Sequence, residues 1–247
     1  MARRIKKTDL GKAWARSRVN RSRVPKVEVR RRILILSEDK KSSCYYFRKY
    51  AKEFLPGYVS VCVCGMGMST KSLVSEVARV ENEELGRLRD SGVINPHFDE
   101  IWVVFDLDDF KEDDFDNAIY MANGMNRCHA AWSNECFEYW YLLHFDKYVS
   151  AMKRKTIFDK LETLIPEYQA RFPETHYEDL KGESGIRIHE DFAMMADARE
   201  KAFQRAQEQD VYWSSGTEPP HGRNPATQVH KLIQALQSSR SIAEKLK

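Results

Sequence analysis

The 247-residue chain lacks any uninterrupted apolar run of 18 residues, the length at which a segment becomes a candidate membrane-spanning helix. Its N-terminus is basic but no apolar segment follows, so the pattern of a secretory signal is absent too. We therefore expect a cytoplasmic protein with no membrane partner. No internal repeat is visible, and the length suits one α/β domain with or without an appended subdomain.

Cysteine is also scarce. The five cysteines are an odd number, and their spacings match no zinc framework. Cys62 and Cys64 would face the same side of a strand, but no second pair accompanies them. We expect reduced, mostly buried thiols, as in cytosolic proteins.

The short Gly65-x-Gly67 pattern does not make a phosphate-binding loop, which argues against a ligase-like or primase-like nucleotidyl enzyme.

Charge is unevenly distributed along the chain. Residues 1–32 contain thirteen Lys or Arg against Asp9 and Glu28, a net charge of +11, so the rest of the chain carries −8. Such a basic arm on an acidic body favours a polyanionic partner, and its apolar residues are too sparse for an amphipathic membrane helix. We predict a disordered arm over residues 1–28 that binds RNA or DNA. A solubilising tail without a partner is the alternative. The residues expected to contact nucleic acid are Arg3, Arg4, Lys6, Lys7, Arg16, Arg18, Arg21, Arg23, Lys40 and Lys41.

Four apolar runs alternate with helical patterns after the arm. The strands are expected at 32–37, 58–64, 100–106 and 128–132, and the helices at 43–54, from 69 or 70 onward, at about 114–126 and at 135–145. This β-α-β-α order predicts an α/β fold with a parallel or mixed sheet flanked by helices, over residues 29–146. Residues 147–247 are expected to be mostly helical, at 154–165, 189–208 and 226–245, and to pack on that core as a subdomain or lid.

Two of the expected strands end in carboxylates. Ile33 to Leu36 leads into Glu38, and Ile101 to Phe105 leads into Asp106 and Asp108, which share one side of an extended chain. The carboxyl ends of parallel strands meet at one edge of a sheet, where ligands bind. Crowded carboxylates suit Mg²⁺ or Mn²⁺, which handle phosphate esters. We predict that Glu38, Asp106 and Asp108 hold one such cation, although acids after strands are also ordinary turn and capping residues.

A third acid and several lysines complete the predicted site. Glu138 lies on the first turn after the fourth strand and is expected to ligate the metal or to orient a bound water, unless it only favours its helix N-terminus. Glu38 is expected to act as ligand or general base. A positively charged side chain should also face the phosphate, and the candidates are Lys40, Lys41 and Lys181. Lys181 starts a Gly-bounded segment, 181–185.

The chain resembles RloB-like proteins in three features. These are Glu38 after the first strand, the Asp106-x-Asp108 pattern and the segment SNECFEYWYLLHF at 133–145. The segment is the most specific part, and the resemblance covers about residues 30–240. The stretch NPATQVHKL at 224–232 and the Arg-rich N-terminus are similar to that family as well. The first motif differs, because family members usually have Gly, Thr and a second Glu where this chain has Asp39, Ser42 and Ser43.

The resemblance implies a fold related to the Toprim metal-dependent nucleases. It also implies phosphodiester cleavage in a bacterial restriction-linked or abortive-infection defence system, often beside an ATPase partner. A catalytically inactive nucleic-acid-binding or regulatory subunit is the alternative, and the changed first motif is the feature in its favour. These residues do not separate DNA from RNA as the substrate.

Overall fold

The computed structural model describes residues 31–57, 59–107, 112–181 and 185–245, without the side chains of residues 112, 113, 181 and 243–245. Asp108 and the basic arm predicted at 1–28 therefore lie outside the described residues.

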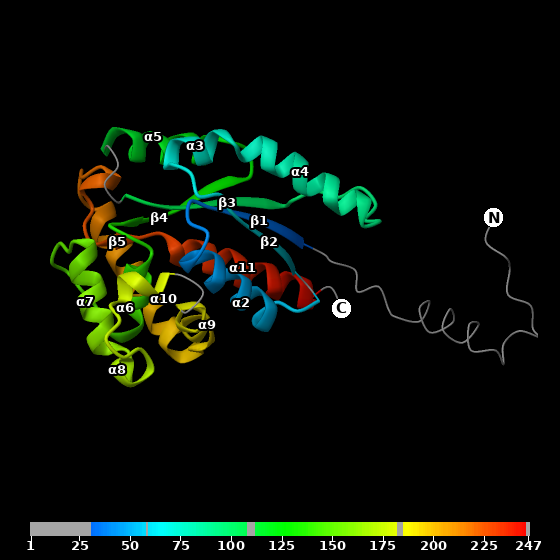
Figure 1. Ribbon diagram of the computed structural model, residues 1–247. Helices are drawn as coiled ribbons and strands as arrows, with labels where there is room; N and C mark the ends of the chain where they lie inside the picture. Colours follow the sequence, from blue (N-terminus) through cyan, green and yellow to red (C-terminus); the bar gives the residue numbers. More distant parts are fainter. Residues whose placement is uncertain (1–30, 58, 108–111, 182–184, 246–247) are drawn as a thin grey trace, which may run out of the picture.

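In the described part of the chain, five strands form one sheet in the order β2-β1-β3-β4-β5. The first four are parallel neighbours, and β5 pairs antiparallel with β4. Their bounds are β1 (Arg31–Ser37), β2 (Val59–Gly65), β3 (Glu100–Asp106), β4 (Cys128–Asn134) and β5 (Ala226–Thr227). The mixed α/β sheet is the predicted fold class, and it is consistent with a Toprim-like arrangement. β3 is apolar from Ile101 to Phe105 because helices cover both of its faces (Figure 1).

One face of the sheet is covered by α3 (Thr70–Ser75), α4 (Val77–Asp90) and α5 (Glu112–Gly124). Leu34 and Leu36 of β1 point to this side and pack with Leu73, Val77 and Phe115. Because strand side chains alternate, every second residue of β1 contributes to each of the two cores.

The other face carries the larger core, which joins Ile33 and Ile35 to residues as distant as Leu236. Helices from both halves of the chain build it: α2 (Ser42–Phe54), α6 (Glu138–Phe145), α7 (Arg154–Leu164), α8 (Tyr168–Arg171), α9 (Ile186–Met194), α10 (Ala196–Ser214) and α11 (Val229–Lys245). Tyr141 stacks on Phe192 of α9 with ring centroids 4.1 Å apart. The predicted helical C-terminal half therefore packs on the sheet (Figure 1).

Four helix predictions are wrong in detail. The helix expected from residue 69 or 70 is broken at Glu76, and the one expected at 189–208 is broken at Met195, whose ψ of 73° is not helical. Residues 226–227 form β5 instead of a helix start, because the Thr227 hydroxyl lies 3.0 Å from that of Ser133 and the pair extends the sheet. The helix expected from 135 begins at Glu138.

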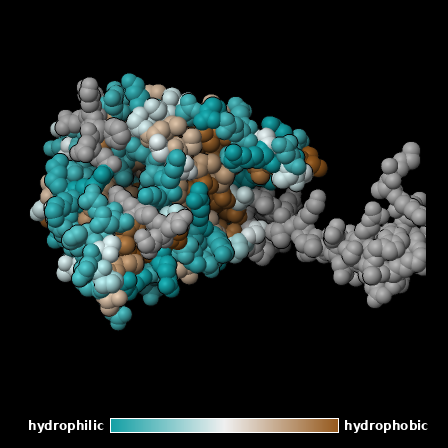
Figure 2. All heavy atoms as spheres, in the orientation of Figure 1, coloured by the Kyte–Doolittle hydropathy of each residue, from teal (hydrophilic) through white to brown (hydrophobic). Residues whose placement is uncertain are grey.

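β2 lies at the edge of the sheet and is only half-buried along most of its length. Figure 2 shows hydrophobic residues gathered in a band between the two helix layers, where Figure 1 places the β2 side of the sheet. Arg48 of α2 donates to the Val63 carbonyl of this strand at 2.9 Å. Among the described residues, no helix is long and apolar enough to cross a membrane.

Candidate active site

The loop after β1 is fixed between two neighbouring strands. The Glu38 N–H donates to the Val104 carbonyl of β3 at 2.9 Å, and the Gly67 N–H donates to the Glu38 carbonyl at 2.7 Å. The Met66 N–H donates to the Ser37 carbonyl at 2.8 Å in the same manner. These three bonds set the backbone of Glu38 at the carboxyl edge of the sheet, where the sequence predicts a ligand site.

The structure brings Glu38 and Asp106 together, as the sequence predicts. The Asp106 N–H donates to Glu38 Oε2 at 3.2 Å, and the Thr70 hydroxyl lies 3.3 Å and 3.4 Å from the two Glu38 oxygens. Burial nevertheless raises the pKa of Glu38 to about 7, since these two hydrogen bonds offset only part of the desolvation. Without a cation, this carboxyl is therefore half protonated near neutral pH.

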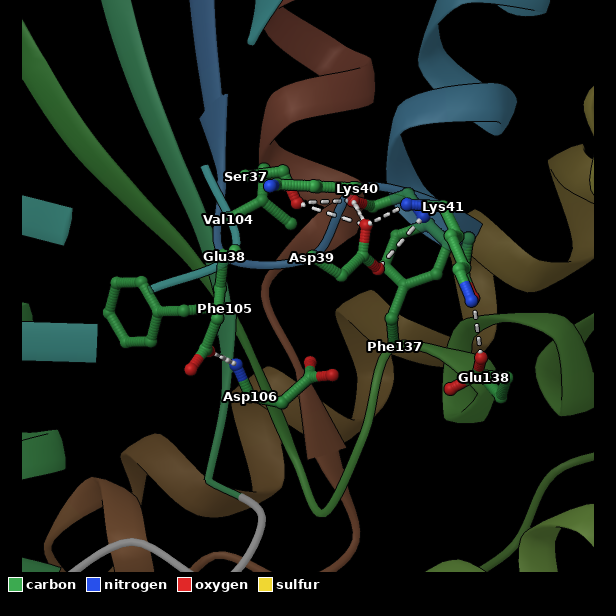
Figure 3. A pocket seen from close by; sticks show the side chains of 13 residues that line it. Ser37, Glu38, Asp39, Lys40, Lys41, Val104, Phe105, Asp106, Phe137 and Glu138 are labelled. Carbon is green, nitrogen blue, oxygen red and sulfur yellow. Dashed lines mark hydrogen bonds between the residues drawn. The ribbon is translucent and has the colours of Figure 1, made fainter. Parts of the chain in front are cut away.

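Asp106 lies between Glu38 and Glu138 in Figure 3. Its Oδ1 atom is buried and has no hydrogen-bond partner among the described residues. Burial raises the pKa of Asp106 well above its ordinary value, and repulsion from Glu138, Glu38 and Asp39 raises it further. An orphaned buried carboxylate oxygen is uncommon and calls for a proton or a cation.

Glu138 reaches the same pocket from the first turn of α6. Its side chain is buried, and Glu138 Oε1 accepts a hydrogen bond from the Ser42 hydroxyl of α2 at 2.8 Å. A Glu that only stabilised the N-terminus of a helix would lie at the surface, whereas Glu138 is buried. Three chain segments thus contribute carboxylates to one pocket.

Asp39 is a fourth acid that the sequence analysis did not assign to the site. Its carboxylate accepts from the Lys41 N–H at 2.9 Å, the Ser43 N–H at 3.3 Å and the Ser43 hydroxyl at 3.2 Å. It therefore satisfies the free N–H groups at the start of α2, which an Asp just before a helix signals in sequence. Burial and then Glu138 raise the pKa of Asp39. Asp39 is not among the non-glycine residues with positive φ, so its turn needs no glycine.

The pocket has a volume of about 390 Å³. Its lining comes from the β1–α2 loop, the end of β3 and the start of α6, namely Ser37, Glu38, Asp39, Lys40, Lys41, Ser42, Ser43, Gly67, Val104, Phe105, Asp106, Phe137 and Glu138. Both predicted lysines of the loop therefore line it. Lys181 ends a short 3₁₀ helix (Tyr177–Lys181), with no described side chain to place. Arg154, which the sequence analysis missed, is close enough to lower the pKa of Glu38 by its charge.

The donor set fits a hard divalent cation. It is all-oxygen, it carries excess negative charge, and Asp106 Oδ1 offers a free ligand atom. Among the described residues, however, no three of these carboxylates place their oxygen atoms within 4.8 Å of one another. One other cluster of side chains does reach that spacing. Mg²⁺ keeps several waters and is often held by only one or two carboxylates, so direct contact from Glu38 and Asp106 would be enough.

The raised pKa of Glu38 predicts a pH-dependent stability of the metal-free protein. The folded state keeps the Glu38 proton up to about pH 7, whereas the unfolded chain releases it near pH 4.5, so this residue lowers stability as pH rises between those values. His144 and His230, whose pKa values burial lowers to about 4, act in the opposite direction between about pH 4 and 6.5. The contribution of Glu38 must therefore be measured as the difference in stability between the wild type and a Glu38 variant at each pH.

We expect Glu38→Gln to melt a few degrees above the wild type at pH 8 and level with it at pH 4. Thermal unfolding in a chelating buffer measures this difference. Saturating Mg²⁺ should reverse the order at pH 8, because the cation favours the ionised carboxylate that Gln lacks. A difference that does not change with pH would contradict the assignment of the raised pKa to Glu38.

A family model described as RloB-like protein matches residues 33–236, most of the chain and both layers of the fold. No curated protein and no solved structure matches significantly.

Proposed function

Because the chain belongs to the family of RloB-like proteins, we propose that it is a metal-dependent nuclease that cleaves the phosphodiester bonds of RNA or DNA. We further propose that it acts in the bacterial cytoplasm as the toxic effector of an anti-phage defence system, together with an ATPase partner. The match supports the family, and the chemistry of the pocket supports the reaction.

The observation that carries the proposal is the position of Asp106. A buried carboxylate with an unpartnered oxygen, held between Glu38 and Glu138, is unfavourable unless a cation or a proton neutralises it. The pocket opens at the carboxyl edge of the sheet, and the loop lysines line it. This combination suits a phosphate ester bound beside a divalent cation.

In this proposal Asp106 and Glu38 hold Mg²⁺ or Mn²⁺, and Asp108 joins them from the segment after β3. When bound, the cation polarises the phosphate and lowers the pKa of a water at the site. The Asp106 N–H and the Thr70 hydroxyl orient Glu38. Its carboxylate then serves as ligand or accepts the proton of the attacking water.

The other pocket residues act on the phosphate and on the acids themselves. Glu138, fixed by Ser42, adds a ligand or orients a water. Lys40 and Lys41 neutralise charge on the phosphate, and Lys181 does so from the end of the 3₁₀ helix. Asp39 holds the loop in place through its bonds to Lys41 and Ser43.

The test is a cleavage assay on single- and double-stranded DNA and RNA. The purified chain, with and without an ATPase encoded beside it, should cut at least one substrate with Mn²⁺ or Mg²⁺. EDTA should stop cleavage and fresh metal should restore it. Cleavage that continues in the chelator would overturn the metal mechanism.

The alternative is a catalytically inactive binding or regulatory subunit. Ser43 stands where the resemblance implies an acid, and the pocket carboxylates do not crowd within 4.8 Å in the described residues, which favours it. It predicts tight, salt-sensitive binding with no turnover in any of these assays.

Deleting residues 1–28 gives a prediction about binding. Phosphate contacts release counterions, so the affinity for nucleic acid should fall and log K should depend less steeply on log[salt], by roughly 0.9 per lost contact to double-stranded DNA. Fluorescence anisotropy over a salt series measures both quantities. An unchanged slope would mean that the arm does not bind phosphates.

A further inference from the structure

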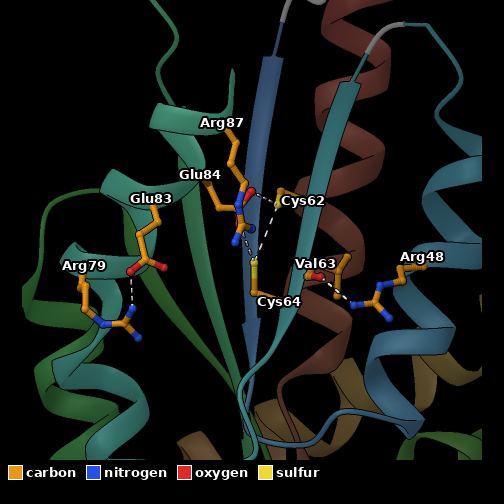
Figure 4. A network of polar contacts seen from close by, with 8 residues as sticks. All are labelled: Arg48, Cys62, Val63, Cys64, Arg79, Glu83, Glu84 and Arg87. Atoms are coloured by element: carbon orange, nitrogen blue, oxygen red, sulfur yellow. Dashed lines mark hydrogen bonds and ion pairs between the residues drawn. The ribbon is translucent and has the colours of Figure 1, made fainter. Parts of the chain in front are cut away.

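Cys62, Cys64 and Glu84 form a second polar cluster, outside the acidic pocket. The two thiols alternate along β2 and so face the same side, toward α4 (Figure 4). Cys62 Sγ lies 3.8 Å from Cys64 Sγ and 3.3 Å from Glu84 Oε2, and Cys64 Sγ lies 3.8 Å from Glu84 Oε1. Among the residues that the structure describes, only this group places three possible ligand atoms within 4.8 Å of one another.

Two of these separations, between the two sulfurs and between Cys62 Sγ and Glu84 Oε2, are close to the edges of a zinc tetrahedron. Zn–S bonds of about 2.3 Å and Zn–O bonds of about 2.0 Å at tetrahedral angles place two sulfurs about 3.8 Å apart, and a sulfur and an oxygen about 3.5 Å apart. We propose that Cys62, Cys64 and Glu84 bind one Zn²⁺ ion, with water as the fourth ligand. The cluster reaches this geometry with β2 regular and α4 intact.

The electrostatics of the cluster also suit a divalent cation. Two thiolates and one carboxylate carry a charge of −3, which Zn²⁺ reduces to −1, and Arg87 supplies the remaining positive charge. Arg87 pairs with Glu84 Oε1 from the next turn of α4, as Figure 4 shows. Oε2 then stays available to the metal, and Arg87 fixes the carboxylate as an outer partner of a metal ligand does.

Zinc binds cysteine in its thiolate form. Binding of zinc releases both thiol protons to solvent, so affinity should rise with pH. A disulfide is the competing use of two cysteines, but their sulfurs lie 3.8 Å apart and both cysteines are free.

The ion would join β2, the edge strand, to the helix layer above it. Soft thiolate ligands select zinc over magnesium, so this site and the acidic pocket should take different metals. The two can therefore be measured independently in one protein.

The experiment is a titration of the reduced, chelator-treated full chain with Co²⁺, a spectroscopic stand-in for Zn²⁺. We expect one equivalent to bind with thiolate charge-transfer bands and the intense visible bands of tetrahedral cobalt. One equivalent of Zn²⁺ should bleach them, whereas Mg²⁺ should not. Glu84→Gln should weaken binding at least about tenfold.

Matched variants decide the result. The double variant Cys62→Ala, Cys64→Ala should lose the bands, whereas Cys128→Ala, a buried cysteine elsewhere, should keep them. Asp106→Asn should keep them too, which separates this site from the proposed nuclease centre. Zinc in hundredfold excess over its Kd should raise the melting temperature of the wild type by about 5–10 °C, and not that of the double variant. Absence of thiolate bands, or their survival in the double variant, would overturn the site.

Discussion

Asp106→Asn should lose cleavage activity by about three orders of magnitude, while the metal-free protein becomes more stable. The proposed cation supplies several kcal/mol of transition-state stabilisation, and each 1.36 kcal/mol corresponds to a factor of ten in rate. The variant removes the ligand with the unpartnered oxygen, a carboxylate whose charge is disfavoured by burial and by repulsion from Glu138, Glu38 and Asp39. Activity and stability should therefore change in opposite directions.

The gain in stability has a definite pH dependence. The pKa of Asp106 is raised in the folded state, so the wild type loses stability as pH rises above the ordinary range of an aspartate, and Asn does not. The melting temperatures should be similar near pH 4 and diverge towards pH 8 in chelator. Asp159→Asn, an exposed carboxylate paired with Lys155 on α7, is the matched control and should change neither activity nor stability measurably.

Two results would count against this account. A variant that cleaves at the wild-type rate would remove Asp106 from the centre. A variant that is inactive but less stable than the wild type at pH 8 would mean that Asp106 is a structural residue with a partner, and the binding-subunit alternative would then be preferred.

Gly65→Ala should distort the acidic pocket although it replaces none of the acidic residues. A Cβ atom at Gly65 would lie 2.8 Å from the Asp39 carbonyl oxygen, 2.8 Å from Lys40 Cα and 2.9 Å from Cys44 Sγ. Two of these are backbone atoms of the loop that presents Glu38, so the loop must move. We expect a loss of about 1–3 kcal/mol in stability and a fall in metal affinity of at least about tenfold.

Gly86→Ala is the control for this substitution. Gly86 lies within α4, and a Cβ there meets nothing within 4 Å, so the same chemical change should stabilise the protein by up to about 1 kcal/mol. Urea unfolding and calorimetric titration with Mn²⁺ measure the two effects. Equal behaviour of the two variants would show that the β1–α2 loop does not depend on contact with Gly65.

The sequence was sufficient to place the elements of the parallel sheet, because buried parallel strands are short apolar runs between helices. It failed where the backbone changes direction within one continuous helical pattern, as at Glu76 and Met195. Residues on both sides of such a break keep helical periodicity, so pattern alone does not show it. The two-residue strand β5 has no periodicity at all and exists through its pairing with Ser133 and Asn134.

Glu38 and Asp106 could be found from sequence because each lies where a strand ends, and Glu138 because it lies on the first turn of the helix that follows β4. Asp39 could have been found from its place before a helix, since its role is local. Glu84 could not, because its partners lie 20 and 22 residues away and meet it only after α4 has packed over β2. The segment 133–145, which carries the family resemblance, mostly builds the core: Tyr139, Trp140, Tyr141 and Leu143 are fully buried.

The position of β2 at the rim of the sheet has a consequence for the order in which the protein fails on heating. The loop that carries Glu38 is anchored through Met66 and Gly67, immediately beyond a strand that has a neighbour on one side only. Border strands fray at temperatures that leave the centre of a sheet intact. On heating, the acidic pocket should therefore lose its metal before the main unfolding transition.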